Sequence, residues 1–119
     1  MENKLLGRHG ELIACTHLRK NGYSILEQNW RYGREEIDII AQLNDLIVFV
    51  EVKTRNTDYT GDPVMAVNTS KRKIVIRIAN EYILSKNIDL ESRFDIIGIV
   101  HNAKETRIDH VEDAFFPTI

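Results

Sequence analysis

Residues 36–55, with the sequence EIDIIAQLNDLIVFVEVKTR, constrain the fold more than any other part of the chain. Two strongly apolar runs, 35–43 and 46–54, flank the turn dipeptide Asn44-Asp45. This pattern predicts a β-hairpin with a two-residue turn. Both runs are apolar on each side, so the hairpin is expected to lie in a sheet with few exposed faces.

The predicted turn fixes which residues of the hairpin face each other. If Asn44 and Asp45 form the turn, Asp38 faces Glu51 and Glu36 faces Lys53, all on one face of the sheet. Opposed residues in such a pair have Cβ atoms about 4.5–5.5 Å apart. A loop of odd length would break this register.

Two opposed carboxylates destabilise a sheet unless one is protonated, with a raised pKa, or a cation lies between them. Mg²⁺ suits such a pair, because it binds one or two carboxylates together with waters and substrate phosphates. A metal there could activate a water against a phosphodiester, with Lys53 taking a proton or offsetting charge. The alternative is a solvated face on which Glu36 and Lys53 form an ordinary salt bridge.

The rest of the chain predicts a mixed α/β fold with the order α-β-β-β-α-β-β. The other expected elements are helices over 3–20 and 69–86, strands over 23–30, 93–100 and 106–111, and a polar loop over 55–63. Asn21-Gly22 is a typical helix end. The β-branched segment KIVIRI could form a strand instead, but its continuation favours a helix. A length of 119 residues predicts one domain, 1–119.

The composition argues against a secreted protein, a membrane-spanning protein and, mildly, a nucleic-acid-binding protein. The net charge of −2 argues mildly against a nucleic-acid binder, so local basic patches must carry that function. A single cysteine, Cys15, favours a reducing compartment, and we read it as buried packing. The sequence lacks a signal-peptide h-region and an apolar run of membrane-span length, which predicts a cytoplasmic protein with no membrane partner.

Five segments together resemble the YraN-like family of bacterial proteins. They are GRHGELIACTHLRKNGYSILEQNWR, EIDIIA, VFVEVKTR, AVNTSKRK and RFDII, and they span the chain from Gly7 to about Gly98. That family is similar to the PD-(D/E)xK nucleases and, among them, to archaeal Holliday junction resolvases. The resemblance implies a restriction-endonuclease-like αβββαβ core with a mixed central sheet flanked by helices. It also implies a Mg²⁺- or Mn²⁺-dependent endonuclease acting on DNA, with branched DNA as one candidate substrate.

The resemblance assigns roles to individual residues. Asp38 and Glu51 resemble the metal ligands, Lys53 resembles the catalytic lysine, and the Val52 carbonyl would be a further ligand. Glu11 resembles the acid of the first helix; on periodicity alone it could be a surface residue. One departure is Glu35, which stands where the family usually has glycine, and it places the loop shape and phosphate approach in question.

Basic residues could line a groove for phosphates. The candidates are Lys71, Arg55, Lys73, Arg8 and Arg34, of which Lys71 matches the family's helix lysine. The alternative is a solvated basic helix face. If the target is a two-fold junction, a homodimer is expected. Two other functions remain open: a nucleic-acid-binding module that does not cleave, and a protein-interaction module.

Overall fold

The computed structural model describes residues 3–55 and 66–117. The elements are α1 (Asn3–Lys20), β1 (Ser24–Tyr32), β2 (Glu35–Leu43), β3 (Leu46–Arg55), α2 (Thr69–Ser85), β4 (Glu91–His101) and β5 (Thr106–Phe115). This is the predicted order, and the segment KIVIRI is helical, as favoured. β3 extends through Arg55, so that residue lies in a strand and not in the loop predicted over 55–63. The remainder of that predicted loop is outside the described residues.

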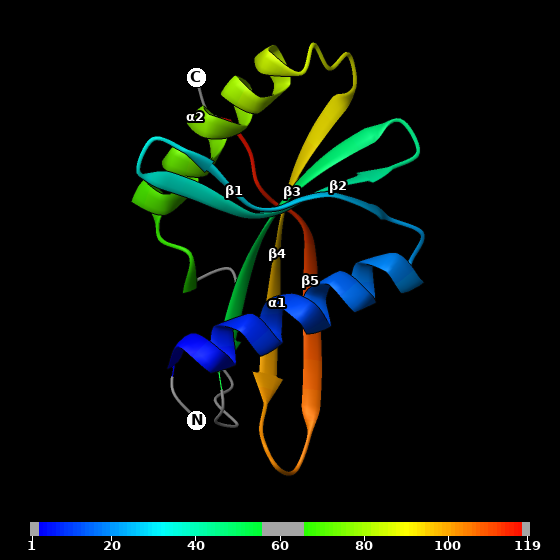
Figure 1. Ribbon diagram of the computed structural model, residues 1–119, viewed down its shortest axis with the longest axis vertical. Coiled ribbons are helices and arrows are strands. Elements are labelled where there is room, and N and C mark those ends of the chain that lie inside the picture. Colours follow the sequence, from blue (N-terminus) through cyan, green and yellow to red (C-terminus); the bar gives the residue numbers. More distant parts are fainter. Residues whose placement is uncertain (1–2, 56–65, 118–119) are drawn as a thin grey trace.

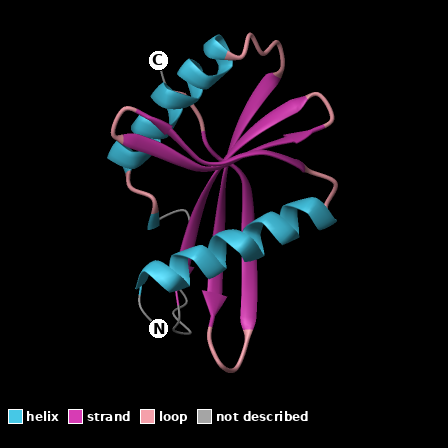
Figure 2. Ribbon diagram, in the orientation of Figure 1, coloured by secondary structure: helices cyan, strands magenta, loops and turns pink. Residues whose placement is uncertain are grey.

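The strands form one five-stranded sheet in the order β1-β2-β3-β4-β5. β3 and β4 are parallel, whereas the other neighbouring pairs are antiparallel. A parallel pair needs a crossover connection, and α2 lies in the connection between β3 and β4. The predicted αβββαβ core with a mixed sheet and flanking helices is therefore confirmed, with β5 added at the edge (Figure 1). Figure 2 shows the twist of this sheet, whose strands fan out from a common centre.

The two helices cover opposite faces of the sheet. Ala14, Cys15 and Leu18 of α1 pack with one set of strand residues, including Val48 and Val50. α2 packs on the other face. Its cluster includes Val75, Ile78, Ala79, Tyr82, Ile37, Ile40, Ile47, Phe49, Phe94, Ile96 and Phe115. The alternating strand residues are thus apolar in both directions, which explains why the hairpin sequence has almost no polar side.

α1 comes unusually close to β3 at one point. Gly10 is buried, and a Cβ at this position would overlap the side chain of Thr54. Glycine therefore lets the helix backbone rest on the end of β3, and Glu11 is the next residue of the helix. None of the helices among the described residues is long and apolar enough to cross a membrane.

Candidate metal and catalytic site

The hairpin has the predicted register. Residues Ile39–Leu43 of β2 pair with Leu46–Val50 of β3, and each pair of numbers sums to 89. Asn44 in the turn has a φ of 54°, a conformation that asparagine adopts more readily than most residues. The turn residues and the buried faces thus fix the pairing that brings Asp38 beside Glu51.

The regular backbone pairing of β2 with β3 stops at Ile39 and Val50. Beyond this pair, carboxylate side chains accept the backbone hydrogen bonds in place of carbonyl oxygens. The backbone N–H of Val52 donates to Oδ2 of Asp38 at 2.7 Å. The backbone N–H of Asp38 donates to Oε2 of Glu51 at 3.2 Å. The two carboxylates are therefore neighbours, and each one satisfies a backbone donor of the opposite strand. Oδ1 of Asp38 and Oε1 of Glu51 lie outside these two hydrogen bonds.

An irregularity in β2 explains where the ladder stops. Ile37 packs in the same core cluster as Ile40, whereas strict alternation would put it with Ile39. The predicted facing pair of Glu36 and Lys53 is therefore wrong, because the β2–β3 pairing ends before it. Glu36 instead lies opposite Arg31 of β1, with 3.7 Å between Oε2 and Nε.

Asn29 of β1 marks the same irregularity from the other side. Gln28 pairs with Ile39 and Trp30 pairs with Ile37, so Asn29 stands opposite Asp38. Its φ of 51° is left-handed, and its side-chain amide donates to Oε2 of Glu11 at 3.1 Å. Asn29 was not predicted from the sequence; the available signal was an asparagine, which tolerates such a backbone, inside a strand.

The site favours a cation or a shared proton. Glu51 is only 2% exposed. Burial, followed by the charges of Glu51 and Glu11, raises the pKa of Asp38 from 3.8 to about 7, against the lowering effect of the Val52 hydrogen bond. Burial also raises the pKa of Glu51, although Lys71 and the hydrogen bond from Asp38 oppose it. A buried and a half-buried acid with raised pKa values are the electrostatic outcome expected of the predicted carboxylate pair.

Lys71, in the first turn of α2, supplies a cation to the acid pair. Its Nζ lies 3.4 Å from Oε1 of Glu51 and donates to the carbonyl of Glu36 at 3.4 Å. Asn68 caps α2 by accepting from the backbone N–H of Lys71 at 2.9 Å, which fixes the start of the helix. Lys71 was predicted as a phosphate contact, but the structure places it against the acid pair.

Glu11 points toward Asn29, yet its charge acts on Asp38. Within residues 3–55 and 66–117, no group of three or more Asp, Glu, His or Cys side chains is close enough together to hold a metal ion. The acid pair itself fits a divalent ion, because Mg²⁺ is commonly held by one or two carboxylates, with waters and phosphate oxygens completing its shell. Glu11, and the carbonyl of Val52, would be additional ligands.

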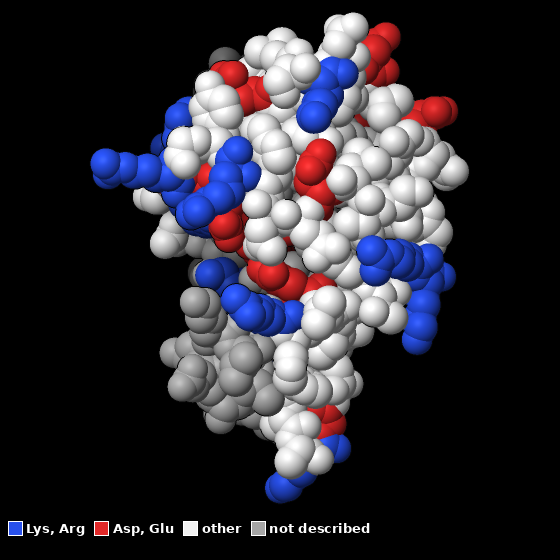
Figure 3. All heavy atoms as spheres, viewed as in Figure 1, with Lys and Arg blue, Asp and Glu red and all other residues white. Residues whose placement is uncertain are grey.

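The other predicted residues surround this pair at various distances. Lys53 is exposed, and its charge lowers the pKa of Glu51 only as a minor contribution. Arg55 ends β3 half-buried, Arg8 is exposed on α1, and Arg34 is exposed in the turn between β1 and β2. Lys73 lies on α2 and is exposed. Figure 3 shows basic and acidic groups interspersed over one face, without a single basic field, which agrees with the net charge of −2.

Asp95 belongs to a separate buried network on the α1 side. It is fully buried and accepts from Arg93 through both oxygens, at 2.8 and 2.7 Å. It is also 2.8 Å from Nε2 of His110 and accepts from the backbone N–H of Asp113 at 3.0 Å. Burial raises its pKa, but the hydrogen bonds from His110, Arg93 and Asp113 outweigh that effect and lower it. These contacts support a structural role for this residue.

Comparison with known proteins identifies the family. The model of the uncharacterised protein family UPF0102 matches residues 10–99. The chain belongs to this family. A UPF0102 protein of Flavobacterium psychrophilum is 46% identical over 115 residues, covering 97% of each chain. A relative from Alkaliphilus oremlandii is 46% identical, and the match covers 95% of this chain and 99% of the relative. A relative from Parabacteroides distasonis is 42% identical, and the match covers 93% of this chain and 92% of the relative.

This assignment confirms the resemblance to the YraN family. Among solved structures, SfsA of Pyrococcus furiosus in complex with Ca²⁺ is similar with a TM-score of 0.39 and 14% identity. The match covers 94% of this chain and 64% of that one. A similarity at this level carries no argument about function, so the function of this UPF0102 protein must be argued from its own residues.

Proposed function

We propose that this UPF0102 protein is a metal-dependent endonuclease that hydrolyses phosphodiester bonds of DNA. The observation that carries the proposal is the acid pair: Asp38 and Glu51 adjoin on neighbouring strands, with raised pKa values and a lysine ammonium 3.4 Å from Glu51. Adjacent carboxylates, one buried and one half-buried, kept together at this electrostatic disadvantage are typical of a site that binds a cation.

In this proposal Asp38 and Glu51 hold Mg²⁺ or Mn²⁺ with the oxygens that the backbone hydrogen bonds leave available. The bound ion would lower the pKa of a water and offset negative charge on the phosphate. In this proposal a bond from the water oxygen to phosphorus would form as the bond from phosphorus to the leaving ester oxygen breaks. The water would lose its proton to solvent, and the leaving oxygen would gain a proton from solvent. Lys53, whose positive charge already acts on Glu51, would stabilise the negative charge that develops on the phosphate in the transition state.

Glu11 and the Val52 carbonyl complete the cluster in this proposal, and basic residues hold the DNA backbone. The candidates for phosphate contacts remain Arg55, Lys73, Arg8 and Arg34. Lys71 is better placed to steady Glu51 and to meet the phosphate at the reacting centre, because it already contacts the acid pair. A two-fold junction as substrate would require a homodimer.

The test is cleavage of labelled linear, flapped and four-way DNA with Mg²⁺ or Mn²⁺. We expect the wild type to cut at least one substrate and Glu51→Gln and Lys53→Ala to cut about 100-fold more slowly or less. Asp109→Asn is the matched control, because Asp109 is an exposed acid on β5. Absence of cutting by the wild type, or equal cutting by all variants, would contradict the proposal.

A second candidate function is a DNA-binding module that does not cleave. The contact between Lys71 and Glu51 favours it, because the chain's own ammonium already neutralises an oxygen that a metal would need. Salt-dependent binding to DNA without cleavage under either divalent ion would support this second function. A protein-interaction module is the third, and absence of DNA binding at low salt would point to it.

A further inference from the structure

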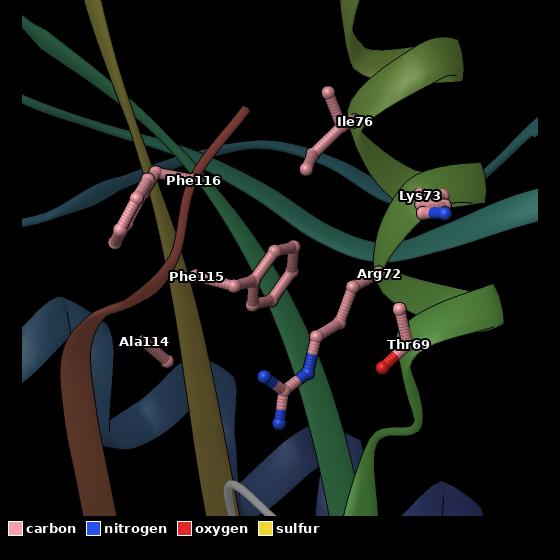
Figure 4. Close-up of a pocket in the computed structure, with 7 residues that line it drawn as sticks. All are labelled: Thr69, Arg72, Lys73, Ile76, Ala114, Phe115 and Phe116. Atoms are coloured by element: carbon pink, nitrogen blue, oxygen red, sulfur yellow. The ribbon is translucent and has the colours of Figure 1, made fainter. Parts of the chain in front are cut away.

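A groove lies between the first turns of α2 and the end of β5. It has a volume of about 230 Å³. Arg72, Lys73 and Ile76 line it from α2, and Ala114, Phe115 and Phe116 line it at and after the end of β5 (Figure 4). We call it the α2–β5 groove. None of the proposed metal ligands lines it, and Lys73 is the one lining residue among the phosphate contacts proposed above.

The groove combines an exposed aromatic ring with two cations. Phe116 is 64% exposed, although a phenylalanine is usually buried, and Phe115 beside it is only 5% exposed. The lining residues include Arg72 and Lys73 and no acidic residue. An exposed ring beside cations is the combination with which proteins bind unpaired nucleotides, since every base has a face for stacking and each nucleotide carries a phosphate.

Arg72 is held in place before any ligand arrives. Its Nε donates to the carbonyl of Val67 at 2.7 Å, and its guanidinium lies 5.9 Å from the centre of the Phe115 ring. Figure 4 shows the Arg72 side chain, from α2, lying beside the Phe115 ring, from β5. A cation fixed in this way loses little conformational entropy when it binds a phosphate.

The groove lies on the same face of the sheet as Glu51. Phe115 pairs with Phe94 and Phe94 pairs with Phe49, which precedes Glu51 by two residues. Two strand spacings separate β3 from β5, or about 10 Å. Two consecutive residues of α2 connect the groove with Glu51: Lys71 forms an ion pair with Glu51, and Arg72 packs on the ring of Phe115.

We infer that the α2–β5 groove binds an unpaired nucleotide of the DNA substrate, with its base stacked on Phe116 and its phosphate near Arg72 and Lys73. This inference rests on the proposed function and narrows the substrate to DNA that has a single-stranded segment near the scissile bond. A flap or an open junction would meet that requirement, whereas a blunt duplex would not.

The test is fluorescence anisotropy in EDTA, where no metal-dependent cutting occurs, with a duplex carrying a three-nucleotide flap and the same duplex without it. We expect Phe116→Ala to weaken flap binding about fivefold or more, the loss of one base–aromatic stack. Binding of the blunt duplex should change less than about twofold, and Phe116→Trp should retain flap binding. Lys73→Gln should reduce the slope of log Kd against log salt by about 0.7.

Leu84→Ala is the matched control, because Leu84 is 66% exposed near the other end of α2. If Phe116→Ala leaves flap binding unchanged, or weakens both DNAs equally, the inference is wrong. It fails independently of the proposed function. If flap binding depends on Phe116 but the protein does not cut DNA, the inference about the groove is supported and the proposed nuclease function is wrong. If the protein cuts DNA but flap binding does not depend on Phe116, the nuclease function is supported and the inference is wrong.

Discussion

At the residue scale, the unusual feature is that two carboxylates replace backbone carbonyls as acceptors in a sheet. Oδ2 of Asp38 and Oε2 of Glu51 accept the N–H groups of Val52 and Asp38. These hydrogen bonds anchor the side chains, so their positions are set by the backbone and not by flexible rotamers. The arrangement keeps two acids together at a cost in stability that is largest when both are ionised.

Asp38→Asn should therefore stabilise the metal-free protein at pH 8. The folded-state pKa of Asp38 is about 7, above its ordinary 3.8, so the folded state binds more protons than the unfolded state between these values. Wild-type stability should fall as pH rises through this window. The asparagine oxygen can still accept from Val52, and we expect a gain of about 1–3 kcal/mol at pH 8 and little near pH 4.

Thermal unfolding at both pH values measures this difference. Asp109→Asn, on the exposed face of β5, serves as control and should show no such dependence. A lower melting temperature for Asp38→Asn at pH 8 would show that the ionised carboxylate stabilises the fold, contrary to this prediction.

Sequence reasoning predicted Asp38 and Glu51 as neighbours because a two-residue turn and two buried strand faces leave one register. It could not predict Asn29 or the position of Lys71. Asn29 has a left-handed backbone conformation, which interrupts the regular alternation of side chains between the two faces of the sheet. The prediction of the site assumed that this alternation is regular. Lys71 meets Glu51 because of how α2 docks on the sheet, which local patterns do not specify. The same interruption makes the predicted pair of Glu36 and Lys53 wrong.

At the scale of elements, the contact of α1 with β3 positions Glu11. Gly10 is in contact with Thr54, whereas a methyl group added at Gly7 on the same helix would have no atom within 4 Å. The two glycines therefore offer a matched pair of substitutions. One tests the packing of α1 on β3, and the other tests helix propensity alone.

Gly10→Ala should destabilise the protein by about 1–3 kcal/mol, because the added methyl group overlaps Thr54. Gly7→Ala should be neutral or stabilising by up to about 1 kcal/mol, since alanine favours helix. Chemical denaturation measures both. Adding Thr54→Ala to Gly10→Ala should restore part of the loss. Equal effects of the two glycine substitutions would contradict the close approach of α1 and β3.

At the scale of the whole molecule, a second polar network connects elements distant in sequence. Asp95 of β4 binds Arg93 and His110, Arg93 donates to the hydroxyl of Tyr23 at 2.6 Å, and His110 lies 3.1 Å from His17 of α1. The network joins α1, the start of β1, β4 and β5 on the face opposite α2. The sequence does not predict this network, because its members come from elements far apart in the chain, including the edge strand β5.

Asp95→Asn should destabilise the protein by about 3 kcal/mol at neutral pH, because it leaves the Arg93 charge without its buried partner. The hydrogen bonds lower the folded-state pKa of Asp95 below 3.8, so its stabilising effect is present above that value and lost as pH falls through the lower one. The gap between wild type and variant should close in acid. Glu112→Gln is the control, since Glu112 is 61% exposed and should change stability by about 1 kcal/mol at most.

Urea unfolding from about pH 3 to about pH 7 measures that gap. A variant as stable as the wild type at neutral pH would show that the Asp95 network does not hold these elements together.

The overall architecture, in contrast, was predictable from sequence. Apolar runs with clear ends set the order of elements, and the length of the β3–β4 connection allowed the parallel crossover that α2 makes.

Asp38 and Glu51 are proposed to bind a divalent ion together. The direct measurement is a Mn²⁺ titration at pH 8 followed by electron paramagnetic resonance, which counts free and bound ions. We predict a site in the wild type whose affinity falls about tenfold or more in both Asp38→Asn and Glu51→Gln and is unchanged in Asp109→Asn. Equal Mn²⁺ binding by the wild type and all three variants would contradict the claim.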